Sequence, residues 1–273
     1  MRIQTPKFNK KTWLYQKRSP LINVTLFLAM VGGLIWLIGR GTEQLGYNWQ
    51  WYQIPKYIFQ FQDGKFQFGL LIEGLMVTFR ITAWSLVLAM VLGLVTALLR
   101  LSDSFIARIV ARGYLELIRN TPLLVQIFFL YFVLAPIFGF SRFFAAVLAL
   151  SLFEGAYISE IFRAGIVSIH RGQWEAAYSL GFNGYHQYRY IILPQAIRRI
   201  LPPLTSQAIS LIKDSALVST IAVYDLTMQG RAIIADTFLT FEIWFTIAAI
   251  YLIITVALSL VVNIMESRLK VAD

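Results

Sequence analysis

The sequence predicts an all-α polytopic membrane protein with about six transmembrane helices. Of its 273 residues, 58% are hydrophobic and only 14% are charged, whereas a typical soluble domain carries about 25% charged residues. Long stretches are almost free of charge, and most approach or exceed the roughly 20 apolar residues that a helix needs to cross a bilayer. A soluble globular protein would instead show amphipathic patterning, so that class is disfavoured.

Six hydrophobic stretches define the predicted helices. They lie at residues 21–39, 70–99, 122–138, 143–166, 204–222 and 242–264. No small-residue cleavage site follows Gly39, so we interpret the first stretch as a retained anchor rather than a cleaved signal peptide. The second is longer than a bilayer requires and should tilt or protrude, whereas the third is near the lower limit.

The distribution of Lys and Arg predicts the orientation. With both termini placed in the cytoplasm, seventeen of these residues fall in cytoplasmic segments and five fall outside. Because cytoplasmic loops carry an excess of Lys and Arg, we expect both termini to be cytoplasmic. Membrane topology thus accounts for the net charge of +10, and no nucleic-acid partner is expected.

Two polar segments are expected on the outer side. Residues 40–67 contain several Trp, Tyr and Phe residues, and aromatic rings favour the headgroup region. An interfacial stretch and a plain connecting loop both remain open for this segment. Residues 223–242 are too polar to cross a bilayer and predict short helices at the outer surface.

The cytoplasmic segment 167–203 is too long and too patterned for a simple connector. Residues 175–180 are good helix formers, and Gly181 can adopt the left-handed conformation that ends a helix. Asn183 can cap a second short helix, and Pro194 suits the first turn of the next one. The prediction is a helix, a sharp turn and a helix. Aromatic side chains available to dock into a groove on a soluble protein are Trp174, Tyr178, Phe182 and Tyr185.

One run of residues in this segment follows a known pattern. It consists of Glu175, Ala176, Ala177, three residues, Gly181, nine residues, Ile191, one residue, Leu193 and Pro194. The run resembles the EAA loop of ABC importer permeases. Residues 77–102, 119–131 and 156–226 are similar to the polar amino acid group of these permeases, which the glutamine and histidine permeases typify. Together these blocks cover most of the chain beyond residue 70.

The resemblance implies a type I ABC importer permease fold, a five-helix core plus an extra N-terminal helix. Residues 1–69 would form a cytoplasmic tail, the extra helix and an outer interfacial segment, and residues 70–273 the permease core, with its coupling loop at 167–203. In the family this loop inserts into the ATP-binding subunit. The residues implied in coupling are Gln173, Glu175, Ala176, Ala177 and Gly181. The resemblance does not explain the role of the added helix.

The implied function is ATP-driven uptake of amino acids across the bacterial cytoplasmic (inner) membrane by alternating access. Expected partners are ATP-binding cassette ATPase subunits, a second permease that is identical or homologous, a periplasmic or surface substrate-binding protein, and membrane lipid. ATP and Mg²⁺ would bind to the partner ATPase, so no cofactor is expected in this chain. Alternatives are the same architecture carrying an osmolyte or inorganic ion, a membrane enzyme, a passive channel, and a structural anchor.

Ionisable side chains at bilayer depth cost a few kcal/mol each, so they normally face a partner, a cavity or a pathway. Both signs occur here, as the recognition of an amino acid zwitterion requires. The candidate pathway residues are Thr78, Arg80, Gln126, Glu154, Tyr157, Lys213, Asp214 and Ser215. Each has a structural alternative, such as helix packing or an outward-reaching side chain. Glu154 stands where the resemblance leads us to expect a neutral residue, and it bears on substrate choice.

Four other charged residues are predicted to serve structure or to be solvated. Glu160 and Arg163 are three residues apart and predict an ion pair within one helix. Glu73 and Glu242 lie near the outer ends of their spans and are expected to be solvated.

Catalytic and metal-binding patterns are not found. The chain has no cysteine and no GxxxxGK[ST] motif for ATP. Its two histidines, His170 and His186, lack metal-ligand spacing and are expected to be solvated or at an interface. We therefore expect a transport subunit rather than an enzyme, with no catalytic residues and no metal site.

Overall fold

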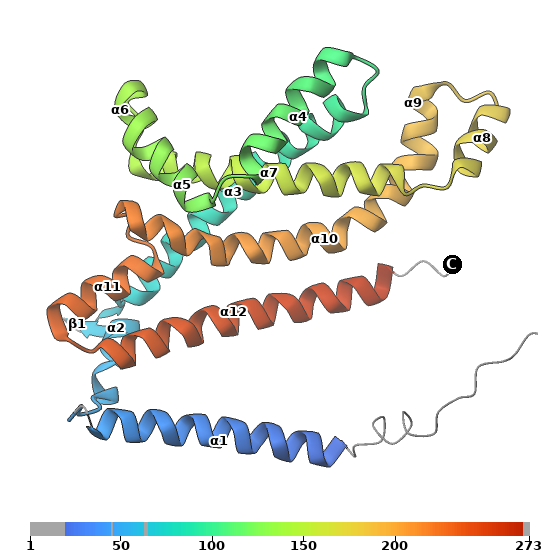
Figure 1. Cartoon of the computed structure of the whole chain (residues 1–273). Helices are drawn as coiled ribbons and strands as arrows, with labels where there is room; N and C mark the ends of the chain where they lie inside the picture. The colour runs from blue at the N-terminus through green and yellow to red at the C-terminus, as the bar shows by residue number, and fades with distance from the viewer. Residues whose placement is uncertain (1–19, 45, 63–64, 270–273) are drawn as a thin grey trace, which may run out of the picture. The chain divides into compact units, whose positions relative to one another are not determined.

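The computed structural model describes residues 20–44, 46–62 and 65–269. These residues divide into two compact units, with the boundary between Trp49 and Gln50. The first unit contains the helix α1 (Pro20–Gln44), drawn in blue in Figure 1. Its stretch Ile22–Gly41 has a mean hydropathy of 2.1, long and apolar enough to cross a membrane, as the sequence predicted for the first span.

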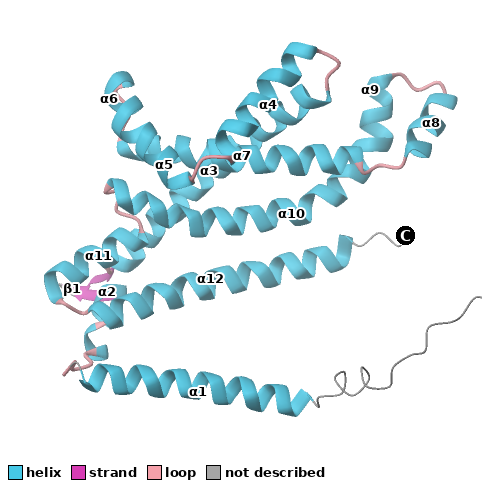
Figure 2. Ribbon diagram, viewed as in Figure 1, coloured by secondary structure: helices cyan, strands magenta, loops and turns pink. Residues whose placement is uncertain are grey.

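The second unit is almost entirely helical (Figure 2). Its first half comprises η1 (Trp51–Gln53), α2 (Pro55–Ile58), β1 (Phe59–Gln62), β2 (Lys65–Phe68), α3 (Leu70–Leu101), α4 (Phe105–Arg119), α5 (Leu123–Phe128), η2 (Phe129–Leu134) and α6 (Ala135–Phe138). Its second half comprises α7 (Arg142–Val167), α8 (Arg171–Ser179), α9 (Gly184–Gln187), η3 (Tyr188–Ile192), α10 (Leu193–Asp214), η4 (Ser215–Ile221), α11 (Leu226–Thr237) and α12 (Thr240–Leu269). The segments η2 and η3 are π-helical, and η1 and η4 are 3₁₀ helices.

Four described helices are long and apolar enough to cross a membrane: those containing Ile22–Gly41, Leu70–Leu101, Arg142–Val167 and Thr240–Met265. A fifth span is possible if α4 and the run from α5 to α6, which meet at 103°, count as one. The predicted span at 204–222 differs from the structure. Its helix, α10, begins at Leu193 and ends at Asp214, and its charged residues and two internal prolines leave it outside the apolar set.

The contact between α3 and α7 organises the core of the second unit. Glycine lets these helices approach closely, because a Cβ at Gly93 would lie 2.6 Å from Cγ2 of Ile158. Gly155 likewise lies against Leu92 and the carbonyl oxygen of Ala89. The small residues that the sequence shows beside Glu154 therefore serve close helix packing. Buried residues of the surrounding cluster include Ile81, Ile127, Leu150, Leu211 and Val218.

Residues 50–68 are folded against the region where α11 and α12 meet. Ile54 and Tyr57 are buried in a cluster with Leu226, Ile233 and Ile243. An antiparallel hairpin follows, in which Phe59 of β1 pairs with Phe68 of β2. Residues 50–68 therefore have a folded structure, and whether they form an interfacial stretch or a loop of no special function stays a prediction.

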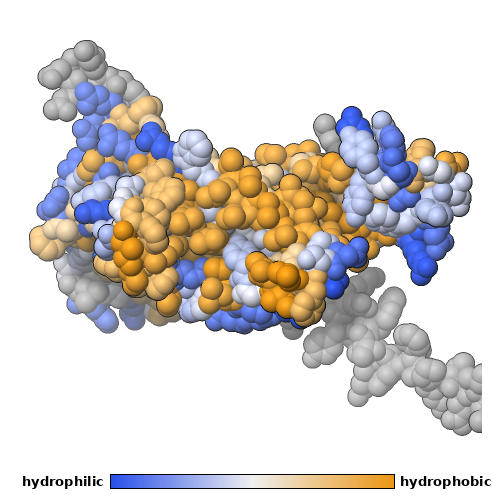
Figure 3. Space-filling view, turned by 90° about the horizontal axis from the view of Figure 1, so that it is seen from above, coloured by the Kyte–Doolittle hydropathy of each residue, from blue (hydrophilic) through white to orange (hydrophobic). Residues whose placement is uncertain are grey.

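A third buried cluster joins α7, η3 and α10 near α8. It contains Ile166, Ile169, Ile192, Ala196 and Ile200. The face shown in Figure 3 carries a broad band of hydrophobic residues, and hydrophilic residues gather toward both ends, one of which holds α8 and α9. Such a distribution suits a chain whose apolar band meets lipid while its polar ends meet water.

Candidate functional site

The segment with the EAA pattern forms a helix, a sharp turn and a second helix, as predicted. The first helix, α8, ends before Gly181, whose φ of +75° lies in the left-handed region. A Cβ at Gly181 would meet no atom within 4 Å, so backbone conformation alone favours glycine here. Asn183 then caps α9, because its side-chain oxygen accepts a hydrogen bond from the His186 amide at 3.0 Å.

Pro194 lies in the first turn of α10, as predicted. The helical segments α9, η3 and α10 follow one another without a break, so Pro194 lies within a continuous helical run. The preceding turn is π-helical, and the Leu193 amide donates to the carbonyl of Tyr188. A wider turn of this kind accommodates a residue that lacks an amide hydrogen.

The five coupling residues lie together on α8 and its turn. Gln173 accepts a hydrogen bond from Nε2 of Gln195 at 3.1 Å, which ties α8 to the start of α10. Glu175 forms an exposed ion pair with Arg171 at 2.9 Å. Ala176 and Gly181 are exposed, whereas Ala177 is buried. The surface available to another protein is therefore formed by the exposed residues of this set and not by Ala177.

Of the four aromatic side chains expected to dock, two are strongly exposed. Tyr178 is 78% exposed and Tyr185 is 65% exposed. Trp174 instead packs against the Ile166–Ile200 cluster, with its ring 5.2 Å from that of Tyr188 in an edge-on contact. Phe182 is half-buried. Tyr178 also lines a groove of about 470 Å³, together with Arg171, Trp174, Glu175, Ser179 and Gln187.

His170 has a role that the sequence analysis missed. Its Nδ1 accepts a hydrogen bond from the Gly172 amide at 3.1 Å, so His170 caps the start of α8. The position before a helical segment was the available signal, although histidine is not among the preferred caps. His186 is exposed, and its ring stacks on Tyr190 at 5.7 Å.

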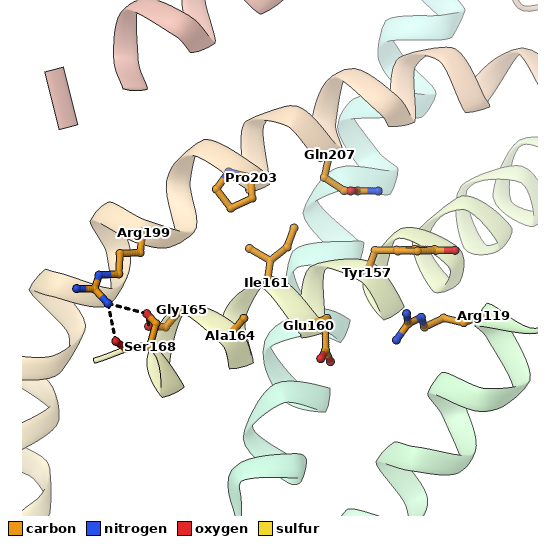
Figure 4. A pocket seen from close by; sticks show the side chains of 10 residues that line it. All are labelled: Arg119, Tyr157, Glu160, Ile161, Ala164, Gly165, Ser168, Arg199, Pro203 and Gln207. Atoms are coloured by element: carbon orange, nitrogen blue, oxygen red, sulfur yellow. Dashed lines mark hydrogen bonds between the residues drawn. The ribbon is translucent and has the colours of Figure 1, made fainter. Parts of the chain in front are cut away.

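A cavity of about 570 Å³ lies between α7 and α10, beside the end of α4 (Figure 4). Its lining residues are Arg119, Tyr157, Glu160, Ile161, Ala164, Gly165, Ser168, Arg199, Pro203 and Gln207. A smaller hollow of about 380 Å³ shares Arg119 and Tyr157 with it. Of the predicted pathway residues, only Tyr157 lines these two cavities directly.

Glu160 is held by two arginines. It pairs with Arg163 of the same helix at 2.7 Å, which confirms the predicted ion pair, and also with Arg100 of α3. The second pair crosses between helices, so a pattern along one helix could not reveal it. Both acceptor oxygens of Glu160 are thus engaged, and the carboxylate is neutralised within the fold.

Glu154 is completely buried in α7 and accepts a hydrogen bond from Nε2 of Gln207. The carboxyl group of Asp214 interacts with that of Glu154. The structure therefore brings together two predicted pathway residues from different helices. Gln207, which the sequence analysis missed, connects them to the larger cavity. Two neighbouring carboxyl groups bind a cation or share a proton more readily than one alone.

The other pathway candidates lie apart from this cavity. Thr78 joins α3 to α11, since its hydroxyl oxygen accepts from the Leu226 amide at 3.2 Å. Gln126 donates to the Ile118 carbonyl at 2.8 Å and to Thr121, which holds the corner between α4 and α5. Arg80 and Lys213 are exposed, and the buried Ser215 donates to the carbonyl of Ile212.

The expectation for Glu242 is wrong, whereas Glu73 is exposed as expected. Glu242 is completely buried, and its carboxylate accepts a hydrogen bond from the Gln50 amide at 2.6 Å. Residues 50–58 fold over the start of α12, and the sequence carries no local sign of this contact. Among the described residues, no group of three or more His, Asp or Glu could hold a metal ion.

Known proteins are similar to this chain in sequence and fold. The glutamine transport system permease protein GlnP of Escherichia coli (strain K12) is 44% identical over 205 residues, which cover 74% of this chain and 94% of GlnP. The L-cystine transport system permease protein TcyB of Bacillus subtilis (strain 168) is 43% identical over 205 residues, covering 73% of this chain and 86% of TcyB.

A solved structure and a family match also relate this chain to transport proteins. The crystal structure of an amino acid ABC transporter with histidines superposes with a TM-score of 0.69 and 41% identity, covering 73% of this chain and 94% of that one. Residues 89–271 match a family of membrane-embedded transport subunits. The chain therefore belongs to the family described as binding-protein-dependent transport system inner membrane component.

Proposed function

We propose that this chain is the permease subunit of an ATP-driven ABC importer that carries amino acids inward by alternating access. The observation that carries the proposal is the α8–Gly181–α9 elbow, in which the EAA pattern forms a rigid turn with exposed Tyr178 and Tyr185. The relatives named for glutamine and L-cystine transport, and the amino acid transporter structure, support the choice of cargo.

The proposed assembly contains two permeases, identical or homologous, two ATP-binding cassette ATPase subunits and a periplasmic or surface substrate-binding protein. ATP and Mg²⁺ bind to the ATPase subunits. Each coupling loop, residues 167–203, inserts into one of them, with both termini of the permease cytoplasmic. ATP-bound and ADP-bound partners prefer different separations of the coupling helices, and so bias two permease conformations.

Coupling would use both exposed and packed parts of the elbow. Glu175 and Gly181 lie on its exposed side, where a partner can reach them. Trp174 and Gln173 connect the elbow to α10 and to the cluster around Ile200. A displacement of α8 would thus be carried to α7 and α10, the two helices that border the larger cavity.

The proposed pathway runs past Tyr157, Gln207, Glu154 and Asp214. The two carboxyl groups supply negative charge for the ammonium group of a substrate. Arg80, Lys213, Ser215, Thr78 and Gln126 lie elsewhere or have structural contacts, and we assign them no substrate contact within this chain.

The test is transport by the reconstituted assembly. Proteoliposomes that contain the permease, its ATPase and the binding protein should take up one or more radiolabelled amino acids only when ATP is supplied. Uptake of an osmolyte or inorganic ion without any amino acid would replace the proposed cargo and keep the importer. Failure of any nucleotide hydrolase to co-purify with the chain would contradict the importer itself.

A further inference from the structure

The charges around the two cavities are not evenly matched. The carboxylate of Glu160 is taken up by Arg100 and Arg163. Glu116 accepts a hydrogen bond from Asn120 at 2.8 Å. Neither carboxylate pairs with Arg119, and among the described residues Arg119 has no ion pair. Arg119 therefore faces both cavities without an ion pair to the described part of the chain, although the carboxylate of Glu116 also lines the smaller hollow.

Arg119 is exposed and contacts Tyr157. Its guanidinium lies over the ring of Tyr157, 5.6 Å from the ring centroid, and Tyr157 in turn packs against Phe153 at 5.1 Å. A guanidinium over an aromatic ring is attracted to its face, and its N–H donors form a planar fork. Such a fork matches the two oxygens of a carboxylate.

The neighbouring arginines are less suited to this role. Arg199 lines the larger cavity but already donates to the carbonyl oxygen of Ser168 at 2.5 Å and to its hydroxyl at 3.1 Å. Arg112 lines only the smaller hollow. Arg119 alone of these three lines both.

The other end of the larger cavity offers the complementary chemistry. Gln207 uses its Nε2 to donate to Glu154, which leaves its Oε1 as an acceptor on a side chain that lines the cavity. Behind it lie the carboxyl groups of Glu154 and Asp214. In Figure 4 the ring of Tyr157 lies between Arg119 and Gln207. A cation and an acceptor thus flank one aromatic ring within a cavity large enough for an amino acid.

From this arrangement we infer that Arg119 binds the α-carboxylate of the transported amino acid, while its ammonium group lies toward Gln207 and Glu154. The inference rests on the proposed function and adds to it a residue and the substrate group that it holds. Glu154 positions the Gln207 amide in addition to supplying charge. The other residues that line the cavity then select among the side chains of different amino acid substrates.

The experiment measures binding to the complete permease–ATPase complex in detergent, without the binding protein. The probes are L-glutamine and L-histidine, each beside its α-carboxamide, which keeps the ammonium and side chain but has no carboxylate. The variants are Arg119→Gln, Arg119→Lys and the matched control Arg108→Gln. Arg108 is an exposed arginine of the same helix that lines neither cavity.

We expect Arg119→Gln to weaken binding of the bound amino acid roughly 10- to 100-fold, since hydrogen bonds to a charged group contribute about 1.5–3 kcal/mol. Binding of the carboxamides should change little. Arg119→Lys keeps the positive charge but lacks the planar set of donors, so its affinity for the amino acid should lie between those of the wild type and Arg119→Gln. Arg108→Gln should bind as the wild type does.

Two outcomes for the variants overturn the inference. Unchanged amino acid binding by Arg119→Gln removes the proposed contact. An equal loss of acid and carboxamide binding shows a structural role instead. If Arg119→Gln does not form the permease–ATPase complex, the same comparison of amino acid and carboxamide binding is made with Arg119→Lys. Absence of amino acid binding by the wild type is a separate result, because it contradicts the amino acid cargo and the inference with it.

Discussion

At the scale of single residues, Asp225 shows how burial changes the pKa of a carboxyl group. It is completely buried at the start of α11, where one oxygen accepts from the Met228 amide at 2.9 Å. Burial raises the pKa of Asp225 from 3.8 to about 6, although hydrogen bonds to the charged form oppose this shift. The folded state therefore holds a proton more readily than the unfolded state, and stability falls as pH rises from 3.8 to about 6.

The variant Asp225→Asn tests this dependence, because asparagine can still cap the helix but does not ionise. The unfolding temperature of the wild type should decrease as pH rises from 3.8 to about 6, and that of Asp225→Asn should stay more nearly constant. A thermal scan of the purified chain in detergent measures both. The exposed Asp236→Asn in the same helix serves as the control, and parallel curves for all three proteins would contradict the assignment.

The residues of the cavity show what a single sequence can reveal. Glu154 and Asp214 were found because a charge within an apolar stretch is costly wherever it lies. Gln207 was not singled out, because nothing in its local sequence distinguishes it from the other neutral polar residues of the chain. Its importance comes from a contact across helices with Glu154. The ion pair between Arg100 and Glu160 was likewise recognised only in the three-dimensional structure.

At the scale of elements, the turn of the coupling loop depends on the conformation of Gly181. A β-branched residue at a φ of +75° is strained by about 1–2 kcal/mol, although the space around it is open. Gly181→Val should therefore redirect α9 relative to α8 and abolish ATP-dependent uptake, with little loss of folded protein. Gly184→Val is the matched control, because a Cβ at Gly184 also meets nothing within 4 Å and its φ is not positive. Normal uptake by Gly181→Val would count against the proposed coupling.

Trp174 tests the internal side of the same elbow. Its ring joins α8 to Tyr188 and to the cluster around Ile200. Trp174→Ala should leave the exposed docking residues in place, so the ATPase subunit still co-purifies, while the amount of amino acid transported per ATP falls. Assays of ATP hydrolysis and uptake on one preparation separate these effects. Tyr178→Ala, which changes an exposed ring, should weaken ATPase binding instead, and the reverse pattern would refute this division.

Elements were predicted best where local chemistry decides them. Gly181 and Asn183 mark a turn and a cap through their own backbone preferences. The π-helical turns before Ala135 and Leu193 were missed, because hydrophobic periodicity does not distinguish them from ordinary helix. The helix expected at 204–222 begins at Leu193 and ends at Asp214, because Pro202 and Pro203 are accommodated inside α10 and Ser215–Ile221 form a 3₁₀ helix.

At the scale of the whole molecule, the orientation proposed from Lys and Arg can be tested directly. The chain has no cysteine, so a single introduced thiol reports its own position. Ser179→Cys on α8 and Ala235→Cys on α11 both replace exposed residues. In intact cells, a membrane-impermeant maleimide should label the second and not the first. The opposite result would invert the topology and exclude a cytoplasmic ATPase at α8.

The architecture as a whole followed from composition, since apolar stretches of bilayer length predict membrane helices. The folded segment 50–68 did not. Its burial of Ile54 and Tyr57, and its capture of Glu242, depend on residues nearly 200 positions away. The match to the family begins at residue 89, so resemblance offered no guide to this segment.

Gly165 has a mechanical consequence. A methyl group there would collide with the side chain of Ile200, so α7 and α10 touch almost backbone to backbone at this point. Helices in such close contact resist sliding past one another, and the motion that remains available to them is rotation about the contact. A rotation of α10 about this contact would displace the opposite end of that helix, so a movement beside α8 would reach the other side of the core.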